Sequence, residues 1–245
     1  ATFMILGSRC TRNCPFCNVE SGSPLAPDPA EPEHVAQAVE KLHLKYSVIT
    51  SVTRDDLPDE GADHFAQTIE AIHSLCPGVK VEVLIPDMHA KPELLDIVLS
   101  AKPDVLNHNM ETVERLYATV RPQAKYRRSL DVLRYAKEKY ASVTKTGIMV
   151  GLGETDDEVR EIMRDMREHG IEMITVGQYL QPSDGHLPVL RYVTPEQFKQ
   201  FEKEAYAMGF TNAAIGAMVR SSYHADMQAH DVLEEQKHKG GCGHH

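Results

Sequence analysis

The chain has 245 residues, of which 42% are hydrophobic and 25% are charged, and its formal net charge at pH 7 is −10. This is the composition of an ordinary globular protein, and the acidic balance argues against an extended nucleic-acid-binding surface, which would need clustered Lys and Arg. No apolar run approaches the ~18 residues of a membrane span and no basic-plus-apolar leader opens the sequence, so we expect a protein of the cytoplasm, or of an organellar matrix if a transit segment was removed.

Short runs of β-branched and apolar residues, each bounded by turn residues, predict six β-strands. They are Thr2–Leu6, Tyr46–Thr50, Val79–Ile85, Asp104–Asn107, Thr144–Val150 and Ile171–Gly177. The segments between and after them carry apolar residues at helical spacing, and helix starts are indicated by Thr155 with Glu158 and by Thr194 with Gln197. Strand–helix alternation repeated about six times predicts an α/β fold with a parallel sheet, either doubly wound or closed into an incomplete barrel.

Polar and Gly-rich segments directly follow five of these strands. They are Gly7–Cys17, Ser51–Asp56, Asn107–Thr112, Gly151–Thr155 and Gln178–Gly185. Because function in parallel α/β folds sits at the carboxyl ends of the strands, we expect these segments to meet at one functional edge.

Three of the five cysteines lie in one of these segments, as the triplet C-x3-C-x2-C formed by Cys10, Cys14 and Cys17. Thiolates are the usual ligands of iron–sulfur clusters, and three of them hold three irons of a [4Fe–4S] cube and leave the fourth iron open to a substrate. The triplet therefore favours a catalyst over an electron carrier. The alternative is a zinc site completed by one of the 13 histidines, although no second C-x2-C or H-x3–5-H pair follows.

Phe16, just before the last cysteine, completes the pattern C-x3-C-x-aromatic-C, which resembles the radical-SAM signature. The stretch from Ala1 to Asp226 as a whole is similar to the lipoyl synthase family. The matching segments are ATFMILGSRCTRNCPFC, VITSVTRDDLPDEGADHF, VEVLIPD, NHNMETVERLYATVRPQAKYRRSL, KTGIMVGLGET, QYLQPS and MVRSSYHAD.

The resemblance implies a partial (β/α)6 TIM-like barrel of the radical-SAM type. It implies that Cys10, Cys14 and Cys17 hold a [4Fe–4S] cluster that binds S-adenosylmethionine (SAM). A 5′-deoxyadenosyl radical would then abstract hydrogens at C6 and C8 of an octanoyl group carried by a protein, and sulfur from a second, auxiliary [4Fe–4S] cluster would replace them. We expect one catalytic domain over residues 1–230 and a flexible tail over 231–245, in which Cys242, His244 and His245 have no assigned role.

The resemblance also places further site residues. Gly151 and Glu154 belong to a Gly-rich turn expected to face the adenine of SAM. Asn109 and Glu111 are expected to bind ribose hydroxyls or the methionine amine. Ser51 and Arg54 are polar positions after another strand, at which a bracing role is the alternative. Lys145, at a strand end, could pair with a carboxylate or be an ordinary strand-end lysine.

In lipoyl synthases the serine before the tyrosine of the R-S-S-Y motif ligates the auxiliary cluster, which here is Ser222, with Ser221 as the fallback. The family's second triplet, C-x4-C-x5-C, is not found in these 245 residues. We therefore expect either an N-terminally shortened form or a protein that takes the missing ligands from elsewhere. SAM cleavage would survive without them, whereas sulfur insertion is in doubt.

The expected partners are an octanoylated lipoyl-carrier domain or the glycine cleavage H protein, and an electron donor such as flavodoxin or ferredoxin. Neither nucleic acid nor membrane is expected. A basic stretch from Val113 to Lys145 is either a docking patch for an acidic partner or a solvated helical face. Two other readings stay open: a different radical-SAM enzyme on the same scaffold, and a non-catalytic metal or electron-transfer module.

Overall fold

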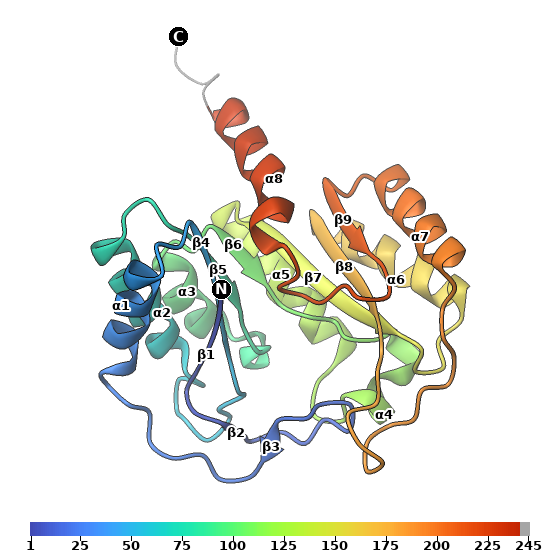
Figure 1. Cartoon of the computed structure of the whole chain (residues 1–245), viewed down its shortest axis with the longest axis horizontal. Helices are drawn as coiled ribbons and strands as arrows, with labels where there is room; N and C mark the ends of the chain where they lie inside the picture. The colour runs from blue at the N-terminus through green and yellow to red at the C-terminus, as the bar shows by residue number, and fades with distance from the viewer. Residues whose placement is uncertain (241–245) are drawn as a thin grey trace.

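The computed structural model describes residues 1–240. Seven strands form one parallel sheet whose order follows the chain, β1-β4-β5-β6-β7-β8-β9. Their bounds are β1 Thr2–Ile5, β4 Tyr46–Ser51, β5 Lys80–Leu84, β6 Val105–Asn107, β7 Val143–Val150, β8 Met173–Gln178 and β9 Asn212–Ile215. Within the described chain, β1 and β9 do not pair with each other, so the sheet curls into a barrel that stays open (Figure 1).

Helices cover the outer face of the curled sheet (Figure 1). The long ones are α1 Glu31–Lys41, α2 Ala62–Leu75, α3 Pro92–Ser100, α5 Tyr126–Tyr140, α6 Asp156–Glu168 and α7 Pro195–Ala207. The short ones are η1 Met88–Ala90, η2 Glu114–Leu116 and α4 Tyr117–Val120. The apolar stripes seen in the sequence bury against the strands: Phe65, Ile69 and Ile72 of α2 have no exposed surface.

The last helix, α8 (Ala225–Gly240), starts at the amino ends of the strands and projects away from the barrel (Figure 1). Its Ala229 and Val232 are buried against the first residues of inner strands, Tyr46, Val105 and Val143. The first turns of α8 thereby cover part of the amino end of the barrel, and the carboxyl end carries the cysteine loop. No helix within residues 1–240 combines the length and the apolar character that crossing a bilayer requires.

All six predicted strands are present, with ends shifted by one to two residues. The seventh strand, β9, was missed because it is short and reads Asn-Ala-Ala-Ile, a weak β pattern. Helix α8 runs through residue 230 to Gly240, so the region expected to be tail from residue 231 begins as helix. Cys242, His244 and His245 lie outside the described residues.

Candidate active site

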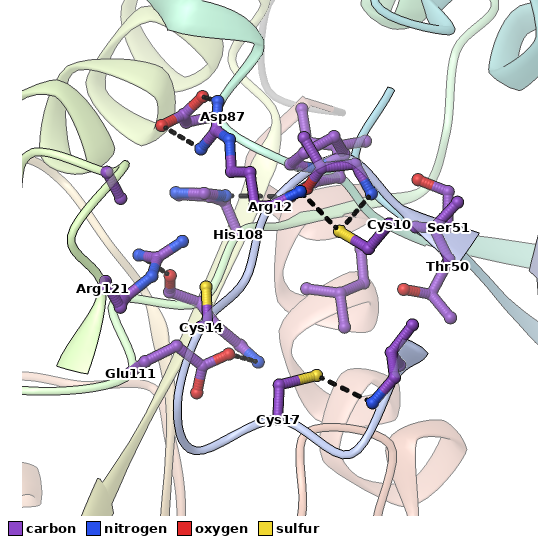
Figure 2. A pocket seen from close by; sticks show the side chains of 18 of the residues that line it. Cys10, Arg12, Cys14, Cys17, Thr50, Ser51, Asp87, His108, Glu111 and Arg121 are labelled. Atoms are coloured by element: carbon purple, nitrogen blue, oxygen red, sulfur yellow. Dashed lines mark hydrogen bonds and ion pairs between the residues drawn. The ribbon is translucent and has the colours of Figure 1, made fainter. Parts of the chain in front are cut away.

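The cysteine triplet lies on the loop after β1, which crosses the carboxyl edge of the barrel. The loop contains the two-residue strand β2 (Arg9–Cys10), which pairs with β3 (Glu20–Ser21). Backbone bonds fix it to the loop after β4, since Thr11 N donates to Thr53 O at 3.1 Å. The side chains of Cys10, Cys14 and Cys17 all line a cavity of about 280 Å³ (Figure 2).

Backbone amides already surround two of the sulfurs. Cys10 Sγ accepts from Thr53 N at 3.3 Å and from Arg12 N at 3.4 Å, and Cys17 Sγ accepts from Val19 N at 3.5 Å. Donors of this kind stabilise anionic sulfur and tune the potential of a bound cluster. Burial acts in the opposite direction, because it raises the pKa of Cys14 to about 11 and raises that of Cys17. Burial therefore disfavours the thiolate forms of Cys14 and Cys17, and a cation in the cavity would make up for the lost solvation.

The spacing of the thiols fits a cluster better than a single ion. Only one group of three His, Cys, Asp or Glu side chains in residues 1–240 brings its ligand atoms within 4.8 Å of one another, and that group is Asp55, Glu60 and His89. The cysteines are spread more widely, as the separate corners of a cube require. No histidine in the described chain therefore completes a compact tetrahedral zinc site with them.

A buried ion-pair network holds the cysteine loop against the barrel. Arg12, which lies between the first two cysteines, pairs with Asp55 at 2.8 Å and with Asp87 at 2.9 Å. Asp87 has no exposed surface and also receives Arg128 of α5 at 2.8 Å. These hydrogen bonds from Arg12 hold the pKa of the Asp87 carboxyl well below its usual range, against the opposing effect of burial.

His108 lies beside this network at the end of β6 and lines the same cavity (Figure 2). Its Nδ1 is 2.8 Å from the Ile85 carbonyl, to which it must donate, and its Nε2 is 3.0 Å from Ser129 Oγ. Burial, followed by the nearby charge of Arg121, lowers the pKa of His108 to about 4. The ring is therefore neutral at pH 7.

Asn109 and Glu111 form another wall of the cavity. The Asn109 amide donates to Glu111 Oε1 at 3.0 Å, and burial raises the pKa of Glu111. Glu111 has φ of +65°, a strained value for a side-chain-bearing residue. Arg121 stabilises this turn, since its Nη1 donates to the Asn109 carbonyl at 2.9 Å.

Two buried polar atoms of the cavity lining have no hydrogen-bond partner among the described residues. They are Ser51 Oγ and Arg121 Nε, from opposite sides of the site. Leaving such atoms unpaired costs about 1–3 kcal/mol each, which a polar ligand in the cavity removes. Together with the thiols, these groups fit a ligand that carries hydroxyl, amine and carboxylate functions.

A second cavity of about 300 Å³ adjoins the first. The two share Thr50, Leu84, Asn109 and Glu111 as lining residues. The second cavity is also lined by Ser221 and Ser222 from the segment after β9, together with Gly147 and Gly177. The structure thus places the cysteine triplet and the serine pair in two adjoining cavities that share Asn109.

Four predicted site residues do not line either of these two cavities. Lys145 and Glu82 form an ion pair at 3.1 Å with no exposed surface, and Arg54 is buried on Asp56 and the Leu6 carbonyl. The Glu154 carboxylate accepts from Gly151 N at 2.7 Å and Leu152 N at 2.9 Å, so it fixes the turn after β7. At Gly151, φ is +110° and a Cβ would lie 2.7 Å from the Arg191 carbonyl oxygen, which explains why this position holds a glycine.

Sequence reasoning did not single out Asp87, His108 or Arg121 as site residues. Arg121 was counted as one charge of the basic stretch, yet its side chain is buried in the cavity wall. A sequence signal existed, because Asp87 and His108 each follow a predicted strand, as the chosen residues do.

Comparison with known proteins agrees with this arrangement. Residues 4–166 match the sequence profile described as the radical SAM superfamily. Lipoyl synthase of Neisseria gonorrhoeae is 62% identical over 247 aligned residues, covering 100% of this chain and 75% of that protein. Lipoyl synthase of Laribacter hongkongensis is 60% identical, covering 96% of this chain and 75% of that protein.

The chain belongs to the lipoyl synthase family.

Lipoyl synthases are radical SAM enzymes that insert sulfur to form the lipoyl group. Superfamily members use a [4Fe–4S] cluster and SAM, a carrier protein bears the lipoyl group, and a reductant supplies electrons. Solved structures confirm the fold. Methylornithine synthase is 14% identical with a TM-score of 0.65, covering 98% of this chain and 81% of that one. Streptococcus suis SuiB bound to S-adenosylmethionine is 12% identical with a TM-score of 0.68, and the match covers 91% of this chain and 52% of that one.

Proposed function

We propose that the cavity at the carboxyl edge is the radical-generating site of a lipoyl synthase and that Cys10, Cys14 and Cys17 ligate its cluster. The observation that carries the proposal is the convergence of three partly buried thiols, two of them already hydrogen-bonded by backbone amides, on the cavity that Asn109 and Glu111 also line. When bound, the cluster and SAM supply the electron transfer that yields methionine and a 5′-deoxyadenosyl radical.

The chain's own groups bind and orient SAM. Ser51 Oγ and Arg121 Nε offer unpaired donors to its charged methionine end. Asn109 and Glu111 offer an amide and a carboxyl group to its ribose hydroxyls, and Arg121 holds their turn in shape. The turn of Gly151 and Glu154 bounds the same edge, where Phe16, Met149 and Leu152 pack in one apolar cluster suited to a flat base. Arg54 and Lys145 are assigned bracing roles.

Ser222 is proposed as the ligand to an auxiliary cluster, since it lines the second cavity while its side chain is exposed and free of the Asn109 contact. The remaining cysteine ligands of such a cluster come from outside these 245 residues, which hold no second triplet. The octanoyl chain of the carrier would enter this second cavity, whose lining is largely apolar, with Val48, Leu84 and Ile148 among its residues.

The carrier is proposed to be an octanoylated lipoyl domain or the H protein, and the electron donor a flavodoxin or ferredoxin. The structure weakens the interpretation of the basic stretch as a docking patch, because several of its charges are paired within the chain. Arg115 pairs with Glu158, Arg128 with Asp87 and Lys137 with Glu172, all within the chain. Arg127, whose side chain is 62% exposed, is the residue of this stretch at which docking of an acidic partner should be tested.

Anaerobic reconstitution with iron and sulfide, followed by dithionite and SAM, tests the proposal. We expect about four irons per chain bound through the triplet, as [4Fe–4S] clusters require, and release of 5′-deoxyadenosine. Cys14→Ala should abolish both, whereas Cys76→Ala, which changes a cysteine outside the cavity, should leave both unchanged. Binding of zinc in place of iron, or no deoxyadenosine from the iron-loaded protein, would overturn the proposal.

A further inference from the structure

Ser221, the first serine of the R-S-S-Y segment, makes a contact that its neighbour does not. Its hydroxyl oxygen lies 2.7 Å from Nδ2 and 3.0 Å from Oδ1 of Asn109, a residue 112 positions earlier in the chain. Glycine makes the contact possible: a Cβ at Gly147 would lie 3.0 Å from Asn109 Oδ1 and 3.2 Å from Ser221 Oγ. The segment after β9 is thus hydrogen-bonded directly to the wall of the first cavity.

The side-chain amide of Asn109 is shared between the cavity wall and Ser221. Its two N–H bonds go to Ser221 Oγ and to Glu111 Oε1, and its Oδ1 can accept from the Ser221 hydroxyl. Oδ1 has two lone pairs, so a ligand hydroxyl can donate to it beside Ser221. Such a ligand would share one amide with Ser221, and hydrogen bonds that share a group alter one another's strength.

We propose that Ser221 is a positioning residue that couples occupation of the first cavity by a ribose-bearing ligand to the conformation of the segment Ala217–Tyr223, which carries Ser222. This inference rests on the proposed function, because the ligand is SAM. The three side chains are joined directly, because Asn109 donates hydrogen bonds to both Glu111 and Ser221. A ligand hydroxyl that donates to Oδ1 shifts the Asn109 amide, and the segment follows because Nδ2 is hydrogen-bonded to Ser221 Oγ.

Hydrogen–deuterium exchange of the cluster-reconstituted chain, with and without SAM, tests the coupling. We expect SAM to change the exchange rate of the amides of residues 217–223 in the wild-type protein. In Ser221→Ala, these amides should exchange about fivefold faster without SAM, since one hydrogen bond is lost, and their response to SAM should disappear. Equilibrium dialysis should give a SAM affinity within about threefold of wild type, because Asn109 and Glu111 remain.

Ser222→Ala is the matched variant, since it removes the other hydroxyl of the segment and leaves the Asn109 contact in place. It should retain the exchange response to SAM. A response that persists in Ser221→Ala, or that is absent from wild-type protein that does bind SAM, overturns the coupling and leaves the proposed function standing. Failure of the reconstituted wild-type protein to bind SAM overturns the proposed function and the coupling with it.

Discussion

Arg12 of the cysteine loop makes a two-pronged contact with Asp87 of the β5 loop, with Nη1–Oδ2 at 3.0 Å and Nη2–Oδ1 at 2.9 Å. Both side chains are buried, and Asp87 also binds Arg128 of α5. A single carboxylate therefore joins the loop that carries the cysteine triplet to a helix on the outside of the barrel.

Asp87→Ala should destabilise the protein by about 3–5 kcal/mol, because it leaves the buried guanidinium of Arg12 and the partly buried one of Arg128 without their shared partner. Urea unfolding of the cluster-free protein measures this, and iron uptake on reconstitution should fall as well. Asp87→Asn keeps the shape of the side chain and part of its hydrogen bonding, so this variant should lose less stability than Asp87→Ala. Equal stability of wild type and Asp87→Ala would contradict the importance of the contact.

His108 makes stability depend on pH. Its folded pKa of about 4 lies below the ordinary value, so the unfolded chain binds the proton more readily. The free energy of unfolding should be unaffected by this group above about pH 6.5 and should fall, by up to about 3 kcal/mol, as the pH drops from there towards 4. In His108→Gln the decline over this window should be shallower. The same slope in both proteins would show that His108 is not the group responsible.

Gly147→Ala should disturb the site more than the fold. The new Cβ would lie 2.5 Å from Thr175 Oγ1 and 3.0 Å from Asn109 Oδ1, so it displaces the amide proposed to bind ribose. We expect SAM affinity to fall about tenfold, the loss of roughly one strong hydrogen bond, while the protein still folds. Gly78→Ala, where a Cβ meets nothing within 4 Å, is the control. Unchanged SAM affinity in Gly147→Ala would argue against the role of Asn109.

Lys145→Met should be strongly destabilising, by about 3–5 kcal/mol, because the Glu82 carboxylate would remain buried without its cation. Two neutral groups also donate to the Glu82 carboxylate, the Tyr46 hydroxyl at 2.7 Å and Asn107 Nδ2 at 2.9 Å, but neither neutralises its charge. The double variant Lys145→Met, Glu82→Leu should recover much of the stability and bind SAM normally. A stable double variant that no longer binds SAM would instead support a direct role of Lys145 in SAM binding.

The sequence predicted the fold well because strand–helix alternation is a local pattern. It placed the cysteine triplet, Asn109 and Glu111 on the correct edge because motif residues follow strands. It could not show that Lys145 and Arg54 lie outside the two cavities, since only the structure reveals that Lys145 pairs with the buried Glu82 and that Arg54 is buried on Asp56 and the Leu6 carbonyl. Arg121 was missed for the converse reason, because a basic residue among other basic residues gives no sign that its side chain turns inward.

The order of strands in the sheet matches their order in the chain, and this has a consequence for synthesis. As the polypeptide leaves the ribosome, each new strand finds its neighbour already made, and the curled sheet grows from one edge. Helix α8 is different, because it packs on residues of β4, β6, β7 and β8 together. Its docking must wait until all four of these strands have emerged, so packing of α8 on the amino end follows assembly of the inner sheet.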